Sequence, residues 1–301
     1  METSKYRLLL KTVEMGNLTK AAAELGYTQS SASYVLNSIE KELGLRLLVR
    51  DHSGTHLTPE GTLLLPAFRE AVSSEDKIRT IVNSISGMQV GTLKIGAFTS
   101  ISLMWLPNII GQFHRKFPQI QIEILSGRGS YQEIQDFLLE GIADCSFICE
   151  PASPGLHSIR LFEDPLRVVL PKEHPLAGQK APISLSQLEN EPFLMPSEGN
   201  CTDIKNLCQK YHFSPKVAFT MQEDLSLLAM VENGLGCTIL PNLILSNYSH
   251  DTAVREIAGN PTRMICIATR NGEILSPLVV EFIRTVREIV FQRANPMQVE
   301  G

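Results

Sequence analysis

The chain has 301 residues, of which 43% are hydrophobic and 20% are charged, and its formal net charge at pH 7 is −5. This composition is typical of a globular protein with two or three domains, and it excludes a disordered chain. The negative net charge argues against a protein that coats nucleic acid nonspecifically. We expect neither a signal peptide nor a membrane span, and therefore predict a cytoplasmic location with no membrane partner.

The first 44 residues predict three short helices. Apolar residues recur at spacings of three and four residues before Gly16, between Thr19 and Gly26, and after Gln29. Thr19 and Thr28 are suitable N-caps for the second and third helices. The residues of the third helix that are expected to face the core are Ala32, Val35, Leu36, Ile39 and Leu43.

The other face of the third helix carries uncharged polar groups. Its residues are Gln29, Ser30, Ser33, Tyr34 and Asn37. Amides and hydroxyls near the N-terminal end of a helix suit the hydrogen-bonding edges of bases in a DNA major groove. The alternative is a plain helical hairpin whose polar face meets only solvent.

A two-stranded wing is predicted after the third helix. The segment LGLRLLVRDHSGTHLTPEG contains a strand from Leu47 to Arg50, a turn at Ser53-Gly54 and a return strand at His56-Leu57. Thr58 is a suitable cap for the next helix, which would begin at Pro59. Three helices followed by such a wing make a winged helix-turn-helix, which we place at residues 1–58.

The motifs TKAAAELGYTQSSAS, IEKELGLRLLVR and LTPEG fall within residues 5 to 61. Together they resemble the DNA-binding region of LysR-type transcriptional regulators. The resemblance implies that the polar face of the third helix contacts double-stranded promoter DNA and that Thr19, Arg50 and Thr58 hold phosphates. Residues 1–60 carry seven Lys and Arg against seven Asp and Glu, so we expect weak nonspecific affinity and a strong dependence on dimerisation.

From Pro59 to about Met88 the apolar pattern predicts one long amphipathic helix, interrupted only by Pro66. Its apolar stripe consists of Leu64, Phe68, Ala71, Val72, Ile78, Ile81, Val82 and Ile85. A small head domain could not bury this stripe, so we predict that residues 59–89 link two copies in a homodimer, and that dimers pair into a tetramer. The alternative is a helix that packs back on its own effector domain.

Residues 90–301 alternate short apolar runs with helical stretches. Runs such as TLKIGAF, ADCSFIC and MICIAT are typical of a buried, largely parallel α/β sheet. The segments 161–169 and 263–270 are expected to cross between two lobes, and the helix from Ser276 towards Ala294 to return to the first lobe. This pattern resembles the two-lobed, periplasmic-binding-protein-like (type 2) effector domain of the same family. Lobe I would comprise residues 90–163 and 268–301, and lobe II residues 164–267.

A small-molecule effector is expected between the lobes, at the carboxyl ends of strands. The polar residues that would contact it are Thr99, Ser100, Ser102 and Cys149 from lobe I, and Ser197, Asn200 and Thr202 from lobe II. Free backbone N–H groups of the helix beside Ser100 and Ser102 would donate hydrogen bonds to an anion. Glu150 and Glu198 would instead favour a neutral or amine-bearing effector. Each hydroxyl residue among the predicted effector contacts, taken alone, is also explained as the cap of a helix.

Two cysteines offer an alternative mode of regulation. Cys201 and Cys208 lie near the place where the peroxide-sensing branch of the family carries its reactive pair, so a thiol-based redox sensor remains open. If both thiols lie on one helix, however, their Cα atoms are about 10 Å apart, which is too far for a disulfide without local unfolding.

Other classes of function are disfavoured by missing motifs. The sequence contains no GxSxG, phosphate loop or HExxH, and no Cys-x-x-Cys pair, so we predict no enzyme activity, no metal site and no cofactor. A pure solute-binding protein would leave the N-terminal head unexplained. We therefore predict a transcriptional regulator whose partners are promoter DNA, a small effector, further copies of itself and the transcription machinery.

Overall fold

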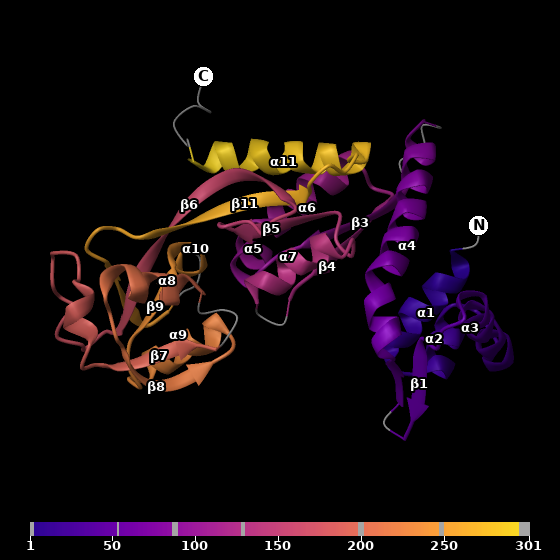
Figure 1. Ribbon diagram of the computed structural model, residues 1–301. Coiled ribbons are helices and arrows are strands. Elements are labelled where there is room, and N and C mark those ends of the chain that lie inside the picture. Colours follow the sequence, from indigo (N-terminus) through magenta and orange to yellow (C-terminus); the bar gives the residue numbers. More distant parts are fainter. Residues whose placement is uncertain are drawn as a thin grey trace. The chain divides into compact units, whose positions relative to one another are not determined.

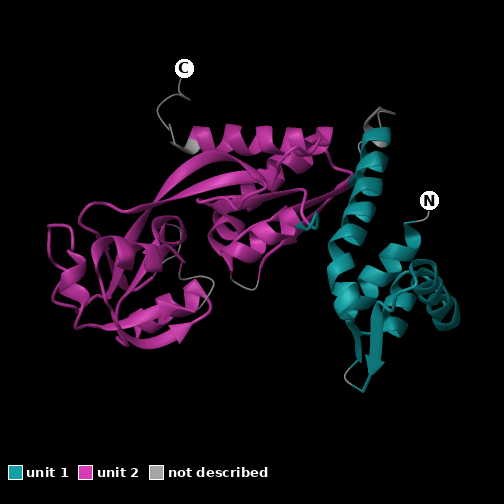
Figure 2. Ribbon diagram, in the orientation of Figure 1, with its two compact units in different colours: residues 1–91, 140–142 teal, residues 92–139, 143–301 magenta. Residues whose placement is uncertain are grey.

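The computed structural model describes residues 3–52, 54–85, 90–127, 130–197, 202–246 and 250–294. Figure 2 shows that the chain forms two compact units, one made of residues 1–91 with 140–142 and the other of residues 92–139 with 143–301. Each unit is described by itself below. Within the described residues, no helix combines the length and the apolar character that crossing a bilayer requires.

The first unit contains the predicted winged helix-turn-helix. Its helices are α1 (Ser4–Met15), α2 (Leu18–Glu24) and α3 (Gln29–Leu43), and its wing strands are β1 (Leu48–Asp51) and β2 (Gly54–Leu57). The wing strands pair antiparallel, with Leu48 opposite Leu57. The long helix α4 (Pro59–Ile85) follows (Figure 1).

The caps of these helices agree with the prediction at one position and differ at another. The Thr28 hydroxyl accepts a hydrogen bond from the Ser31 backbone N–H at 3.2 Å and so caps α3, as predicted. The predicted cap of α2 was wrong, because the Asn17 side chain accepts from the Lys20 N–H at 3.0 Å and Thr19 lies inside the helix. Asparagine is one of the preferred N-cap residues.

The core of the head is formed by apolar side chains from all three short helices. Leu8, Leu9, Ala22, Ala32, Leu36 and Ile39 are buried together with Leu47 and Phe68. Val35 is only partly buried, and Leu43 was wrongly assigned to the core because it remains 41% exposed at the end of α3.

Two side chains fix the wing against the helices. A Glu40 carboxylate oxygen on α3 accepts hydrogen bonds from the backbone N–H groups of Leu47 and Leu48, at 2.7 and 3.1 Å. Gly61 lies where the start of α4 meets the wing, and a Cβ atom there would come within 2.3 Å of the Leu47 carbonyl oxygen. This close approach explains the glycine of the LTPEG motif.

Helix α4 is continuous through Pro66, as predicted. The assignment of its apolar stripe needs one correction, since Leu64 and Phe68 pack on the core of their own head. Farther along, Ile78 and Val82 are each 53% exposed. Leu63, which lies outside the predicted stripe, is 81% exposed. The exposed apolar surface of α4 therefore comprises part of that stripe together with Leu63.

The second unit is built on a seven-stranded sheet of order β10-β6-β11-β5-β3-β4, in which β9 also pairs with β6. The strands of lobe I are β3 (Gly91–Gly96), β4 (Ile120–Leu125), β5 (Cys145–Cys149) and the first part of β6 (Leu156–Pro171), with β11 (Thr262–Arg270). Strands β9 (Thr238–Pro241) and β10 (Thr252–Glu256) pair with the second part of β6 in lobe II.

The long strands β6 and β11 connect the lobes, and they run antiparallel to each other. The predicted crossing segments are thus correct, whereas the expectation of a largely parallel sheet holds only for pairs such as β3–β5. Within β11, Ile265 to Ala268 lie against β5 of lobe I, while Thr262 pairs with Pro165 of β6.

Helices cover the sheet of lobe I, as Figure 1 shows. They are α5 (Thr99–Met104), α6 (Leu106–Lys116), α7 (Tyr131–Leu139) and α11 (Pro277–Ala294). The rings of Phe113 on α6 and Phe282 on α11 pack edge to face with centroids 5.4 Å apart. The last helix therefore does return to lobe I.

Lobe II completes its core with a second, two-stranded sheet and short helices. Strands β7 (Pro192–Pro196) and β8 (Lys216–Met221) run parallel. The helical elements are η1 (Leu185–Leu188), α8 (Thr202–Tyr211), α9 (Asp224–Glu232) and α10 (Asn242–Leu245). The first turns of α8 and α9 carry Asp203 and Asp224, which become important for the site.

Candidate functional site

The polar face of α3 lies on the solvent side of the head. Of the five residues predicted to contact bases, Gln29, Ser30, Tyr34 and Asn37 are exposed and Ser33 is half-buried. The aromatic side chain of Tyr34 is 77% exposed. Since Ala32, Leu36 and Ile39 are buried in the core, α3 presents one face to the protein and leaves the other available.

The residues predicted to hold phosphates divide into two groups. Thr19 and Arg50 are exposed, and an Arg50 guanidinium N–H donates to the Ser33 hydroxyl oxygen at 3.4 Å. Thr58 is buried, its hydroxyl donates to the Arg46 carbonyl at 2.7 Å, and it accepts from the Gly61 N–H at 2.9 Å. These contacts make Thr58 the predicted cap of α4, and they remove it from the phosphate contacts because its hydroxyl is occupied inside the protein.

The cations of the head also divide into two groups. Lys5, Arg7 and Lys11 form ion pairs with Glu42, Asp76 and Glu24, respectively. By contrast, the exposed residues Lys20, Lys41, Arg46 and Arg50 form no ion pair with any residue that the structure describes. The equal count of charges in the sequence therefore hides a set of cations that remain available to phosphates.

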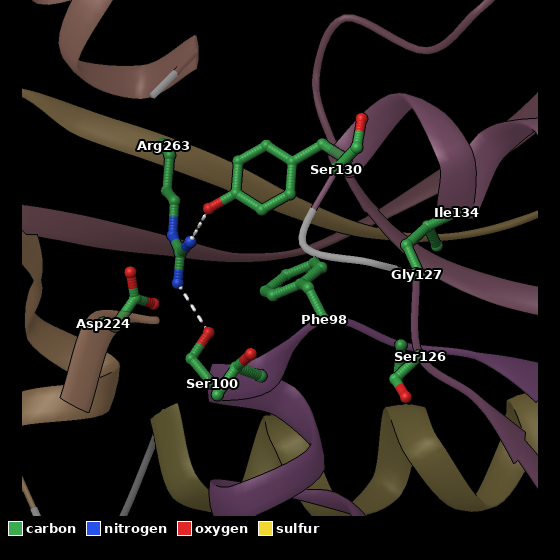
Figure 3. Close-up of a pocket in the computed structure, with 11 residues that line it drawn as sticks. Phe98, Ser100, Ser126, Gly127, Ser130, Ile134, Asp224 and Arg263 are labelled. Atoms are coloured by element: carbon green, nitrogen blue, oxygen red, sulfur yellow. Dashed lines mark hydrogen bonds between the residues drawn. The ribbon is translucent and has the colours of Figure 1, made fainter. Parts of the chain in front are cut away.

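In the second unit, a small pocket lies between the lobes. Residues of lobe I, Asp224 of lobe II and Arg263 at the start of β11 line it (Figure 3). Its lobe-I lining comprises Ala97, Phe98, Thr99, Ser100, Ser126, Gly127, Ser130, Tyr131 and Ile134. The cavity volume is about 30 Å³, which is enough for one or two water molecules.

Arg263 is the central cation of this pocket, and its guanidinium is already surrounded by protein acceptors. Two of its nitrogens donate to one Asp164 carboxylate oxygen, at 3.0 and 2.8 Å. A further N–H donates to the Ser100 hydroxyl at 2.8 Å, and another to the Tyr131 hydroxyl at 2.5 Å. The guanidinium carbon also lies 5.1 Å from the Phe98 ring centroid, within the range of a cation–π contact.

Three carboxylates from three different elements surround that single cation. Asp164 on β6 is fully buried, and its second oxygen accepts from the Leu243 N–H at 2.8 Å. Asp203 on α8 accepts from the Tyr131 hydroxyl at 3.0 Å and lies 3.6 Å from the guanidinium. Asp224 on α9 faces the pocket, but it forms no hydrogen bond or ion pair with any described residue.

Burial dominates the electrostatics of this cluster. It raises the pKa values of both Asp164 and Asp224, and the attraction of Arg263 opposes that rise in each case. Burial would lower the pKa of Arg263, but the surrounding acidic groups hold it well above its usual range. The pKa of the Tyr131 hydroxyl is likewise raised, chiefly by burial, so Tyr131 is neutral and donates its proton.

Only part of the predicted effector site is found in the pocket. Thr99 and Ser100 line it, whereas Ser102, Cys149, Ser197 and Thr202 are not among its lining residues. Cys149 is nevertheless close enough to Arg263 for a Coulomb interaction, although burial raises the pKa of its thiol to about 12. Asn200, Cys201 and Glu198 lie outside the described residues.

Two predicted features of the pocket are corrected by the structure. The backbone N–H groups of Ile101 and Ser102 both donate to the Phe98 carbonyl, so an anion at the start of α5 would have to use the N–H groups of Thr99 and Ser100. The Glu150 carboxylate forms a two-point ion pair with Arg160, at 2.7 and 2.8 Å, instead of bordering the pocket. Arg160 accordingly lowers the pKa of Glu150.

Five residues of the site were missed in the sequence: Arg263, its hydrogen-bond partners Asp164 and Tyr131, and the acids Asp203 and Asp224. A signal for two of them was present, because Arg263 opens the apolar strand RMICIATR and Asp164 interrupts the long run LFEDPLRVVL. A charged residue inside an otherwise buried strand requires a partner of opposite charge. The partner itself is about a hundred residues away in the chain, and periodicity cannot identify it.

The described member of the cysteine pair, Cys208, lends no support to the redox alternative. Cys208 is half-buried, and burial raises the pKa of its thiol, which disfavours the reactive thiolate. No group of three or more His, Cys, Asp or Glu among these residues is placed to hold a metal ion.

Comparison with known families assigns both units. Residues 86–290 match the model of the LysR substrate binding domain, and residues 3–62 match the model of the bacterial regulatory helix-turn-helix protein of the lysR family. The chain is also 27% identical over 292 residues to the uncharacterized HTH-type transcriptional regulator YvbU of Bacillus subtilis, which covers 96% of this chain and 99% of that protein.

Solved structures of similar fold cover almost the whole chain. A full-length OxyR variant from Pseudomonas aeruginosa has a TM-score of 0.75 at 24% identity, and covers 96% of this chain and 94% of that one. Full-length CbnR in complex with its target DNA has a TM-score of 0.67 at 22% identity, and covers 96% and 99%. With the two family models matching head and effector domain, the chain belongs to the LysR family and is a DNA-binding transcriptional regulator with an effector-binding domain.

Proposed function

We propose that the exposed face of α3 supplies the base contacts of this regulator, through Gln29, Ser30, Ser33, Tyr34 and Asn37. The observation that carries the proposal is the division of α3 into a buried apolar face and an exposed face of uncharged polar groups. Amide and hydroxyl groups match the donor and acceptor pattern of base edges, and the Tyr34 ring offers an apolar contact for a thymine methyl group.

Phosphate contacts would come from the exposed cations around that face. We assign this role to Thr19 and Arg50, and extend it to Lys20, Lys41 and Arg46, because none of these cations is paired with an acid among the described residues. Phosphate contacts fix the position of a protein on DNA without selecting a sequence. CbnR, whose structure with target DNA shares this fold, gives a precedent for DNA binding by the arrangement.

Dimerisation would occur through α4. LysR regulators form oligomers, and the exposed side chains of Ile78 and Val82 leave an apolar surface that a second copy would cover. A dimer presents two heads and therefore requires two half-sites on the promoter. The role of a promoter-binding regulator would also include pairing of dimers into a tetramer, contact with the transcription machinery and a cytoplasmic location.

The effector would bind in the pocket between the lobes, next to Thr99, Ser100 and Arg263. Residues of both lobes and of the connecting strand meet there, so a ligand can change the relation between the lobes. A ligand shifts such an equilibrium only by the difference between its affinities for the two arrangements. The pocket would enlarge beyond its present volume when the effector binds and the lobes change their arrangement.

Substitutions in α3 and in the wing test the DNA contacts separately. We expect Gln29→Ala to reduce the preference for a cognate promoter over random DNA by about 1–3 kcal/mol, since a base contact is lost. Arg50→Ala should weaken binding to both DNAs about equally and reduce its salt dependence. The measurement is a binding titration of the full chain against both DNAs at two salt concentrations.

Gln119→Ala is the matched control, because Gln119 is an exposed glutamine in the other unit. It should change neither affinity. Unaltered promoter preference in both Gln29→Ala and Asn37→Ala would show that this face of α3 does not contact bases.

A further inference from the structure

The charge balance of the interlobe pocket bears on the chemical class of its ligand. Arg263 supplies one positive charge, while Asp164, Asp203 and Asp224 supply three carboxylates. Tyr131 remains neutral because burial raises its pKa. Among the described residues, the site therefore has more negative than positive charge.

Arg263 has little capacity left for an anionic ligand. Its guanidinium has five N–H donors, and four of them already donate to Asp164, Ser100 and Tyr131. The fifth N–H is on the Nη1 nitrogen, and the Asp203 carboxylate lies 3.6 Å from that nitrogen. A ligand carboxylate would have to displace protein acceptors and enter among three like charges, which is unfavourable in a partly buried site.

Asp224 has the opposite property, since it lines the pocket and no described residue donates a hydrogen bond to it. Figure 3 shows its carboxylate beside the cavity and separate from the hydrogen bonds that Arg263 forms with Ser100 and Tyr131. No described residue gives Asp224 a hydrogen bond or an ion pair, and burial raises its pKa. A half-buried carboxylate in this state is stabilised when a cation with N–H donors binds to it.

The size of the cavity fits such a group. Its volume of about 30 Å³ is enough for one or two water molecules. An ammonium group is of that size and presents up to three or four N–H donors to carboxylate and hydroxyl acceptors. The described residues offer no set of three ligands for a metal ion, so an organic cation is favoured over an inorganic one.

We propose that the effector of this regulator carries a primary or secondary ammonium group, which Asp224 binds with support from the negative charge of Asp203. This inference rests on the proposed effector role of the pocket. It replaces Glu150, which is paired with Arg160, as the residue that would select an amine. Asp164 is not part of the ammonium site, because both of its oxygens are occupied by Arg263 and Leu243.

The test uses the full chain and four probes that share a three-carbon skeleton: propylamine, propanol, propionate and β-alanine. Thermal unfolding is recorded at pH 7 and constant ionic strength, since a ligand that binds only the native state raises the melting temperature. We expect propylamine and β-alanine to stabilise the second unit, and propanol and propionate to leave it unchanged. Titration calorimetry then gives the affinities.

Variants locate the effect. Asp224→Asn should lower the affinity for propylamine at least about tenfold (1.4 kcal/mol), while Asp224→Glu should retain most of it. Asp251→Asn is the matched control, because it removes an exposed carboxylate of the same lobe that pairs with Lys172. Any of three results would overturn the inference. Propionate stabilises the chain as much as propylamine does, Asp224→Asn binds propylamine with undiminished affinity, or neither amine stabilises the chain.

Promoter binding tests the proposed effector role of the pocket separately from the ammonium inference. If propionate or another anion alters promoter binding of the wild-type chain and Ser100→Ala removes that response, the effector role of the pocket stands and only the ammonium inference fails. If an amine binds through Asp224 but leaves promoter binding unchanged, the ammonium site stands and the effector role fails.

Discussion

The polar face of α3 and the polar cluster around Arg263 use similar side chains in opposite ways. On α3, Gln29, Tyr34 and Asn37 are exposed. In the interlobe cluster, the Arg263 guanidinium is buried and donates to three different side chains. The first surface is free to form bonds with another molecule, whereas the second has already formed most of its bonds within the protein.

This difference teaches where substitutions should affect stability and where they should affect binding. Removing an exposed polar group leaves nothing unsatisfied inside the protein, so folding is little changed. Removing one member of a buried charged pair leaves the other charge without a partner in a region of low dielectric constant. The two regions should therefore respond in different assays.

The largest effect is expected for Arg263→Met. The substitution leaves Asp164 fully buried without its cation, so we expect a loss of about 3–5 kcal/mol in the free energy of unfolding of the second unit. The measurement is urea unfolding of the full chain, followed by a probe of that unit such as Trp105, which is its single tryptophan.

Arg160→Met is the matched control for this change. Arg160 forms a similar two-point contact with Glu150, but its side chain is 69% exposed. An exposed pair contributes at most about 1 kcal/mol. Equal losses in the two variants would contradict the view that burial, and not the pairing itself, makes the Arg263 contact important.

A smaller effect on stability is expected in the head, and only at its caps. Thr28→Ala removes the hydroxyl that accepts from the Ser31 N–H, and should lower the stability of the head by about 1 kcal/mol. Gln29→Ala, one residue later, should change it by less than about 0.5 kcal/mol because Gln29 is exposed. Thermal unfolding monitored by circular dichroism compares the two, and a larger loss in Gln29→Ala would show that α3 depends on its polar face for folding.

The same contrast explains how much the sequence could predict. In the head, contacts are local: the spacing of Ala32, Leu36 and Ile39 defines the buried face of α3, and the opposite face follows from it. The cap at Thr28, the wing and the continuous helix α4 were predicted on the same basis. Asn17 was missed as a cap because Thr19 offers the same chemistry two residues later.

In the effector domain, the lobes and the crossing strands were predicted, but most of the site was not. Arg263 meets Asp164, Ser100 and Tyr131, which lie 99, 163 and 132 residues away in the chain. No local pattern encodes such pairs. The hydroxyl residues near strand ends identified Thr99 and Ser100, while the acids that determine the charge of the pocket come from the first turns of α8 and α9.

The smallest effect on stability, and the most informative about the pocket, is expected for Asp224→Asn. Because burial raises the pKa of Asp224 in the folded state, its ionisation favours the unfolded chain, and its contribution to stability is lost as pH rises through the folded pKa. Asp224→Asn should therefore melt slightly higher than the wild-type chain at pH 7. This advantage should vanish as pH falls below about 3.9, the ordinary pKa of an aspartic acid, where Asp224 is protonated in both states.

Melting temperatures of the two proteins between about pH 3 and pH 8 measure this dependence, with Asp251→Asn as a reference that should show no such difference. If the stability of Asp224→Asn relative to the wild-type chain instead rises towards acid pH, a cationic group of the protein stabilises the Asp224 carboxylate. That result would remove the basis of the ammonium site. If the variant is more stable at neutral pH and also loses amine binding, the chain keeps the Asp224 carboxylate at a cost to its own folding. Such a cost is the expected signature of a group retained for a ligand and not for the fold.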